Sequence, residues 1–210
     1  MLLLKNGYLI DPASETEGYR DILINTENGK IEQILPQGTV PSANDMEEID
    51  LSGQIMAPGL VDVHVHFRDP GLTYKEDIAS GAKSAAKGGF TSVVLMANTK
   101  PTVDTVETLG YVLEKGKETG IHVYSCANVT MGMKGRILTD MEALSARGAA
   151  GFTDDGIPLM HEEVLKEALR RAAKLNRPVS LHEENPALIA NNGVNAGKAA
   201  AHYGIDGSPR

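Results

Sequence analysis

The sequence predicts an α/β protein in which a short β-rich segment precedes repeated strand–helix units. Residues 1–55 contain short apolar strands separated by turn residues. From residue 60 on, apolar strands alternate with segments rich in the helix formers Ala, Glu, Lys and Leu. These strands begin at residues 60, 90, 121, 149 and 178, a spacing of 28 to 31 residues. Such regularity is typical of right-handed βα units on a parallel sheet.

The N-terminal segment, residues 1–55, is predicted to form part of a small β-sandwich. Asn6-Gly7 predicts a turn between two strands, and the stretch from Thr26 to Gly29 predicts a second hairpin. The expected strands are Leu2–Lys5, Tyr8–Ile10, Asp21–Asn25, Lys30–Leu35 and Glu48–Leu51. They are too short and turn-rich to enclose a large core of their own.

Residues 56–210 are predicted to form about five βα units of a TIM-type (β/α)8 barrel. The expected strands are Leu60–Phe67, Phe90–Met96, Ile121–Ala127, Ala149–Thr153 and Pro178–His182. The expected helices are Lys75–Lys87, Asp104–Glu118, Thr139–Ala146 and Glu162–Leu175. A closed barrel typically needs about 250 residues, so this chain is expected to hold an incomplete, truncated barrel. An open doubly wound sheet is the alternative.

Composition and charge exclude several classes of protein. The 210 residues carry 20 Lys and Arg against 28 Asp and Glu, a net charge of −8, which argues against nucleic acid as a partner. No apolar run approaches the roughly 20 residues that span a bilayer, so no membrane segment is expected. The one cysteine, Cys126, excludes an internal disulfide framework and suits a cytoplasmic protein.

Two histidines mark the end of the first predicted barrel strand. Side chains alternate between the faces of a strand, so His64 and His66 are expected to point the same way. Two imidazoles on one face can bind one metal ion, although such a pair can also be an ordinary hydrogen-bonded feature of a strand. This strand end belongs to the C-terminal mouth, where barrel enzymes have their active sites, and we therefore favour a metal site.

Further ligand types follow the fourth and fifth strands. Asp154-Asp155-Gly156 alone could be a turn, and His182 alone could be a structural strand-end histidine. The parallel strands bring these residues to the same mouth as the first two histidines. Imidazole and carboxylate ligands without thiolate suit zinc or a similar divalent ion in a hydrolytic site.

Arg68 and Asn98 are candidate substrate-binding residues at the same mouth. A guanidinium and an amide can together hold a substrate carboxylate. The alternative is an Arg68–Asp69 ion pair and an Asn-capped turn.

Several motifs together resemble dihydroorotase of the amidohydrolase superfamily. They are His64-Val-His-Phe-Arg-Asp-Pro-Gly71, Lys75-Glu-Asp-Ile78, Gly88-Gly-Phe-Thr91, Asn98-Thr-Lys-Pro101 and Asp154-Asp-Gly156. The likeness covers essentially all 210 residues. His-x-His alone marks only the superfamily, whereas the longer strings are more specific. Allantoinase and other cyclic amidases share part of the pattern and are the nearest rivals.

The resemblance implies a metal-dependent hydrolase with one or two Zn²⁺ ions. Many relatives bridge two metals with a carboxylated lysine after strand four, but this chain has no lysine there, and the motif assigns the bridging role to Asp155. The implied ligands are His64, His66 and His182. A further histidine ligand and the catalytic aspartate are expected beyond residue 210, so this chain is expected to contain no catalytic residue and to be inactive alone.

The implied reaction is the reversible cyclisation of N-carbamoyl-L-aspartate to L-dihydroorotate in pyrimidine biosynthesis. In it, His66, Arg68 and Asn98 would bind the substrate. An alternative is a non-catalytic dihydroorotase-like protein that binds aspartate transcarbamoylase, as some relatives do, and a homo-oligomer is also open. The intact set of ligands argues against a degenerate pseudoenzyme.

Overall fold

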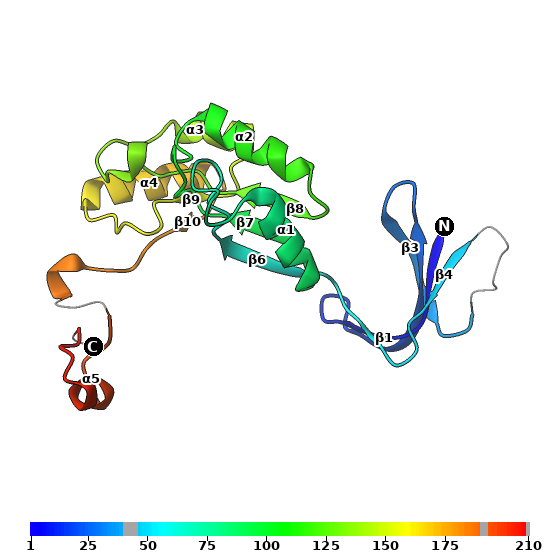
Figure 1. Ribbon diagram of the computed structural model, residues 1–210. Helices are drawn as coiled ribbons and strands as arrows, with labels where there is room; N and C mark the ends of the chain where they lie inside the picture. Colours follow the sequence, from blue (N-terminus) through cyan, green and yellow to red (C-terminus); the bar gives the residue numbers. More distant parts are fainter. Residues whose placement is uncertain (40–45, 190–192, 209–210) are drawn as a thin grey trace. The chain divides into compact units, whose positions relative to one another are not determined.

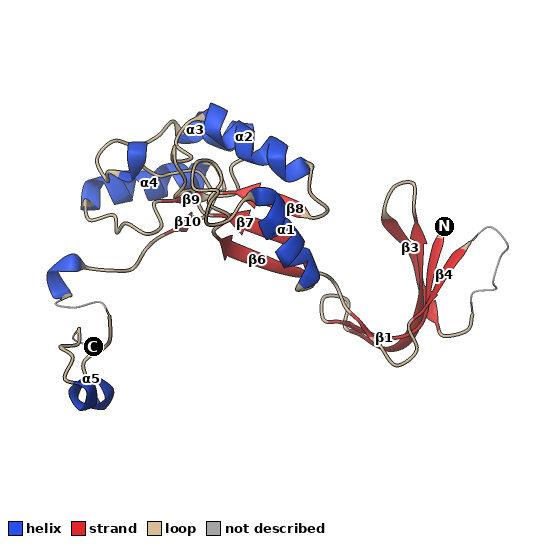
Figure 2. Cartoon of the chain, in the orientation of Figure 1, coloured by secondary structure: helices blue, strands red, loops and turns tan. Residues whose placement is uncertain are grey.

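The computed structural model describes residues 1–39, 46–189 and 193–208 (Figure 1). The chain divides into two compact units, Met1–Gly59 and Leu60–Arg210, whereas the sequence predicts the change between residues 55 and 56. The described part of the first unit contains strands without helices, and the second unit alternates strands with helices (Figure 2).

The first unit contains a five-stranded sheet. Its strands are β1 (Leu2–Asp11), β2 (Thr16–Asn25), β3 (Lys30–Pro36), β4 (Glu47–Asp50) and β5 (Ile55–Met56). β2 pairs antiparallel with both β1 and β3, while β4 and β5 pair parallel with β1. Leu9, Ile22 and Met56 form a small buried core. The described residues of this unit form this one sheet, and the sandwich stays a prediction.

The predicted turn at Asn6-Gly7 is wrong, whereas the hairpin between β2 and β3 is confirmed. β1 runs continuously through Asn6, and its register against β2 shifts between Leu4 and Gly7. Asn6 adopts a left-handed backbone with φ 66°, and its N–H donates to the Asp21 carboxylate at 3.0 Å. Asparagine tolerates this conformation in a bulge as well as in a turn, so the dipeptide alone does not distinguish them.

The described residues of the second unit form five parallel strands, as predicted. They are β6 (Leu60–Val65), β7 (Phe90–Leu95), β8 (His122–Ser125), β9 (Phe152–Thr153) and β10 (Val179–Ser180). β6, β7 and β8 pair in that order, β9 pairs with β10, and a parallel bridge joins Ala127 to Phe152. The strands therefore follow one another in chain order, without the reversal that defines a doubly wound sheet. Closure into an eight-stranded barrel stays a prediction.

The described part of the second unit has five α-helices, four between these strands and one after β10, and side-chain caps fix where the first three begin. They are α1 (Ile78–Lys87), α2 (Val106–Lys117), α3 (Met141–Arg147), α4 (Glu162–Lys174) and α5 (Lys198–Tyr203). Asp77 accepts a hydrogen bond from the Ser80 N–H, so α1 starts three residues later than predicted. Thr105 and Asp140 cap α2 and α3 in the same way. None of the helices in the described ranges is long and apolar enough to cross a membrane.

The core of the second unit is built by side chains of the strands and of helices α1 to α4 (Figure 2). Val93 of β7 and Leu109 of α2 are fully buried there, as is Phe152 of β9. Burying side chains of this size stabilises the fold by roughly 1.5–3 kcal/mol each. This packing holds the strand ends in place, and the polar residues beyond them form the candidate site.

Candidate metal centre

Four side chains predicted as metal ligands meet at the C-terminal ends of the parallel strands. Asp155 is the centre of the group. Its Oδ2 lies 3.5 Å from Nε2 of His64 and 3.5 Å from Nε2 of His66, and its Oδ1 lies 3.5 Å from Nδ1 of His182. His64, His66 and Asp155 each offer one potential ligand atom, and these three atoms lie within 4.8 Å of one another. The two oxygens of one carboxylate therefore face different histidines.

The backbone of β6 places the first two histidines. His64 lies within the strand and His66 one residue beyond it, so both rings are on the same side and their centroids are 5.2 Å apart. The pairing of β6 with β7 shifts register between Asp62 and Val65, and the His64 N–H donates to the Asp62 carboxylate at 3.0 Å. Such a bulge redirects a side chain at the end of a strand.

Asp155 lies two residues beyond β9 and is largely buried. Its N–H donates to Thr153 Oγ1 at 2.9 Å, which fixes the turn after the strand. The neighbouring Asp154 points away and accepts hydrogen bonds from the N–H groups of Val129 and Thr130, at 2.9 and 3.2 Å. Burial raises the pKa of Asp154, against these hydrogen bonds. The structure thus brings Asp155, not Asp154, to the histidines.

His182 faces Asp155 with one ring nitrogen and Glu184 with the other. Its Nε2 and the Glu184 Oε2 are 2.8 Å apart, and this hydrogen bond is the main reason that the pKa of His182 is raised. A carboxylate on the second nitrogen fixes the orientation of an imidazole that binds metal through the first. Sequence reasoning missed this role of Glu184, although a carboxylate two residues after a strand-end histidine was the available signal.

Asn98 lies next to His66. Its Oδ1 is 3.0 Å from Nδ1 of His66, and its Nδ2 donates to the backbone oxygen of Asp155 at 3.3 Å. Since the amide oxygen can only accept, Nδ1 of a neutral His66 donates to Asn98, and Nε2 then carries the lone pair on the side of Asp155. Asn98, predicted to bind substrate, here connects two of the candidate ligands.

The spacing and chemistry of these groups fit a divalent metal ion. Ligand atoms bound to one tetrahedral zinc at about 2.0–2.2 Å lie roughly 3.3–3.6 Å apart. The 3.5 Å separations between Asp155 and the histidine nitrogens match this spacing and are long for direct hydrogen bonds. Neutral imidazole with carboxylate is a donor set that suits zinc.

Arg68 does not form the predicted alternative pair with Asp69. Asp69 is buried and binds Lys115 Nζ at 2.6 Å and the Tyr111 hydroxyl at 2.9 Å, both from α2. The hydrogen bond to Asp69 raises the pKa of Lys115. Within the described ranges, the Arg68 side chain has no hydrogen bond or ion pair, which leaves its guanidinium available for a ligand. Sequence reasoning missed Tyr111 and Lys115 because nothing in the helix pattern indicates a buried partner.

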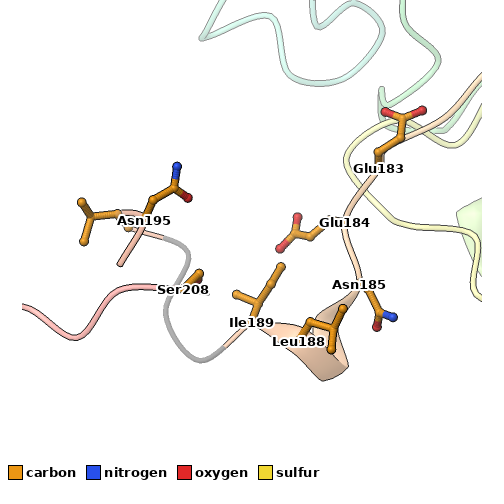
Figure 3. Close-up of a pocket in the computed structure, with 9 residues that line it drawn as sticks. Glu183, Glu184, Asn185, Leu188, Ile189, Asn195 and Ser208 are labelled. Atoms are coloured by element: carbon orange, nitrogen blue, oxygen red, sulfur yellow. The ribbon is translucent and has the colours of Figure 1, made fainter. Parts of the chain in front are cut away.

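A cavity of about 480 Å³ lies beyond His182, along the segment that follows β10 (Figure 3). Glu183, Glu184 and Asn185 line it from that segment, and Asn195 and Ser208 from later in the chain. Glu184 connects this cavity to His182. The histidine itself lines a second cavity of about 310 Å³ with residues 158–160.

A run of parallel βα units whose strand ends bring together histidines and an aspartate defines the class of the amidohydrolases. The fold agrees with solved structures of that class. L-hydantoinase (dihydropyrimidinase) from Arthrobacter aurescens superposes with a TM-score of 0.70 at 23% identity, covering 89% of this chain and 41% of that one. D-hydantoinase (dihydropyrimidinase) from Thermus sp. gives 0.66 at 25% identity, covering 90% and 41%.

The chain belongs to the dihydro-orotase-like family, whose model matches residues 53–210. It is 52% identical to a dihydroorotase from Clostridioides difficile (strain 630) over 209 residues, covering 99% of this chain and 48% of that protein. A dihydroorotase from Streptococcus pneumoniae is 49% identical over 208 residues, with the same two coverages. The chain thus spans about half the length of the curated relatives it matches.

Proposed function

We propose that the complete protein is a dihydroorotase, which interconverts N-carbamoyl-L-aspartate and L-dihydroorotate in pyrimidine biosynthesis. The observation that carries this proposal is the identity of 52% to a curated dihydroorotase across almost the whole chain. The motif that follows β6 and the aspartate among the histidines support it. The barrel would be completed by residues outside this chain, which would also supply the further histidine ligand and the catalytic aspartate.

His64, His66, His182 and Asp155 would hold one or two zinc ions. With two ions bound, Asp155 would have the bridging role. Zinc, when bound, supplies Lewis acidity and lowers the pKa of a coordinated water toward about 7. Asn98 holds the proton on Nδ1 of His66, and Glu184 holds the ring of His182, so that each ring presents one nitrogen to the site.

We assign Arg68 to the free carboxylate of dihydroorotate. Its planar guanidinium can form two parallel hydrogen bonds with a carboxylate, a geometry that lysine does not offer. The loop after β6 places it two residues from His66 at the mouth of the sheet. Recognition of this carboxylate would separate dihydroorotate from neutral cyclic amides.

The test is a turnover assay of the complete gene product loaded with zinc. Dihydroorotate, allantoin, hydantoin and 5,6-dihydrouracil are compared as substrates. We expect turnover of dihydroorotate in the ordinary enzyme range of about 1–10³ s⁻¹ and much lower kcat/KM for the other three. A preference for allantoin or hydantoin would show that the protein is a different cyclic amidase. Absence of any turnover together with binding of aspartate transcarbamoylase would favour the non-catalytic alternative.

A further inference from the structure

The buried carboxylate of Asp69 forms an ion pair with the partly exposed Lys115, and the proposed chemistry does not use this pair. The Asp69 side chain is only 1% exposed, and both of its oxygens bind α2: Oδ2 accepts from Lys115 Nζ at 2.6 Å and Oδ1 from the Tyr111 hydroxyl at 2.9 Å. The Lys115 ammonium also lies 5.3 Å from the centre of the Tyr111 ring. A buried carboxylate with a cation and a hydroxyl on its two oxygens is a strong, directional anchor.

The anchor holds the residue next to Arg68. The loop after β6 is further fixed by two backbone hydrogen bonds, from Lys100 N–H to Pro70 O and from Leu72 N–H to Arg68 O, both at 3.0 Å. Arg68 itself adopts a left-handed backbone with φ 62°. A residue with a β-carbon keeps this conformation only where its surroundings enforce it. Asp69 follows Arg68 directly in the chain, and α2 holds its side chain by both carboxylate oxygens.

We propose that Lys115 and Tyr111 are positioning residues for substrate recognition: through Asp69 they hold the Arg68 backbone in the conformation that directs its guanidinium to the substrate carboxylate. This inference rests on the proposed function for its substrate. The hydrogen bonds of both side chains go to Asp69, which is not a candidate metal ligand. Their removal therefore affects recognition of the carboxylate and leaves the metal site intact.

The experiment compares Lys115→Met and Tyr111→Phe with Lys117→Met in the zinc-loaded complete protein. Lys117 is the matched control, since it lies on the same helix, is 69% exposed and pairs with Glu114. We expect Lys115→Met to lower kcat/KM for dihydroorotate about tenfold, mainly through KM. A left-handed conformation of a residue other than glycine costs about 1–3 kcal/mol, and about 1.4 kcal/mol corresponds to tenfold. Tyr111→Phe shows a smaller loss, and Lys117→Met none. The zinc content of all three stays at the wild-type value.

Two further measurements separate positioning from a general loss of structure. The Lys115→Met variant should turn over 5,6-dihydrouracil, which is dihydroorotate without its carboxylate, at the rate of the wild type. In an Arg68→Ala background, adding Lys115→Met should cause no further loss, because Lys115 acts through Arg68. An equal loss on both substrates, or losses that multiply in the double variant, would overturn the proposal.

Hydrogen exchange decides the inference independently of the reaction. In Lys115→Met, the amides of residues 67–69 and 71–73 should exchange faster than in Lys117→Met, while those of β7 keep their protection. Unchanged exchange in that segment overturns the inference even if turnover falls. If the wild type fails to act on dihydroorotate, the proposed function fails, and faster exchange in Lys115→Met still supports the anchoring of the loop.

Discussion

Replacing Asn98 by alanine tests which of two roles this residue has. The amide was predicted to bind substrate, but in the structure it bonds Nδ1 of His66 at 3.0 Å and the backbone oxygen of Asp155 at 3.3 Å. We predict that Asn98→Ala weakens zinc binding in the complete protein. Without the amide, the His66 ring loses the partner that keeps its proton on Nδ1, and Nε2 is no longer held ready for metal.

The magnitude follows from the contacts that are lost. A neutral hydrogen bond contributes about 0.5–1.5 kcal/mol, which corresponds to a two- to roughly tenfold change in affinity. Loss of a partner that orients a metal-binding imidazole typically costs about 10–100-fold. His66 is half-buried, with 28% of its side chain exposed, so water replaces part of the lost bond. We therefore expect a loss of about tenfold, where the two ranges meet.

The assay is competition for zinc between the protein and a chelator of known affinity, with bound metal measured after separation. Arg68→Ala is the matched control, because it alters the same mouth without touching a ligand, and its zinc affinity should equal that of the wild type. The reasoning is refuted if Asn98→Ala binds zinc like the wild type and only the KM for dihydroorotate rises. That result would assign Asn98 to the substrate alone.

Three further predictions concern the substrate, the fold and the thiol. Arg68→Ala should reduce kcat/KM for dihydroorotate by roughly ten- to more than a hundredfold, the value of a charge-assisted hydrogen bond; an equal loss on 5,6-dihydrouracil would contradict carboxylate recognition. Asp154→Ala should lower the free energy of unfolding by about 2–4 kcal/mol in denaturant titrations, since it leaves the buried N–H groups of Val129 and Thr130 without an acceptor; an unchanged midpoint would show that water replaces the carboxylate. Burial raises the pKa of Cys126 from 9.0 to about 11, so its thiolate fraction near pH 7 is about a hundredfold lower. Mass spectrometry should find its peptide alkylated far more slowly in the native protein than in urea, and equal rates would mean that the thiol is accessible.

The order of strands and helices in the second unit was predictable from the sequence because each βα unit repeats the same pattern of apolar and helix-forming residues. The spacing of 28 to 31 residues gave five strands, and the structure contains all five in parallel. Boundaries were less predictable. β9 is regular only over Phe152–Thr153, whereas the apolar run predicted Ala149–Thr153, since apolar character marks burial and not the length of regular pairing.

The candidate ligands were predictable because each follows a strand whose end is fixed by topology. The alternation of side chains along a strand placed His64 and His66 on one side. It did not decide between the adjacent Asp154 and Asp155, and only the motif assigned the bridging role to Asp155. The sequence did not reveal the contacts that hold the loop with Arg68 in place. The pairing of Asp69 with Lys115 joins residues 46 positions apart, and no local sequence pattern predicts this contact. It depends on how α2 packs against the loop after β6.

The close approach of the loops after β6 and β7 has a consequence for redesign of the protein. Gly71 has φ 82°, and a β-carbon added there would lie 1.7 Å from the carbonyl oxygen of Lys100. A side chain at position 71 would therefore require the backbone at Lys100 to move. Libraries that diversify one loop alone will mostly yield misfolded clones, and grafting from a cyclic amidase of different specificity must transfer residues 68–72 and 98–101 as a single cassette.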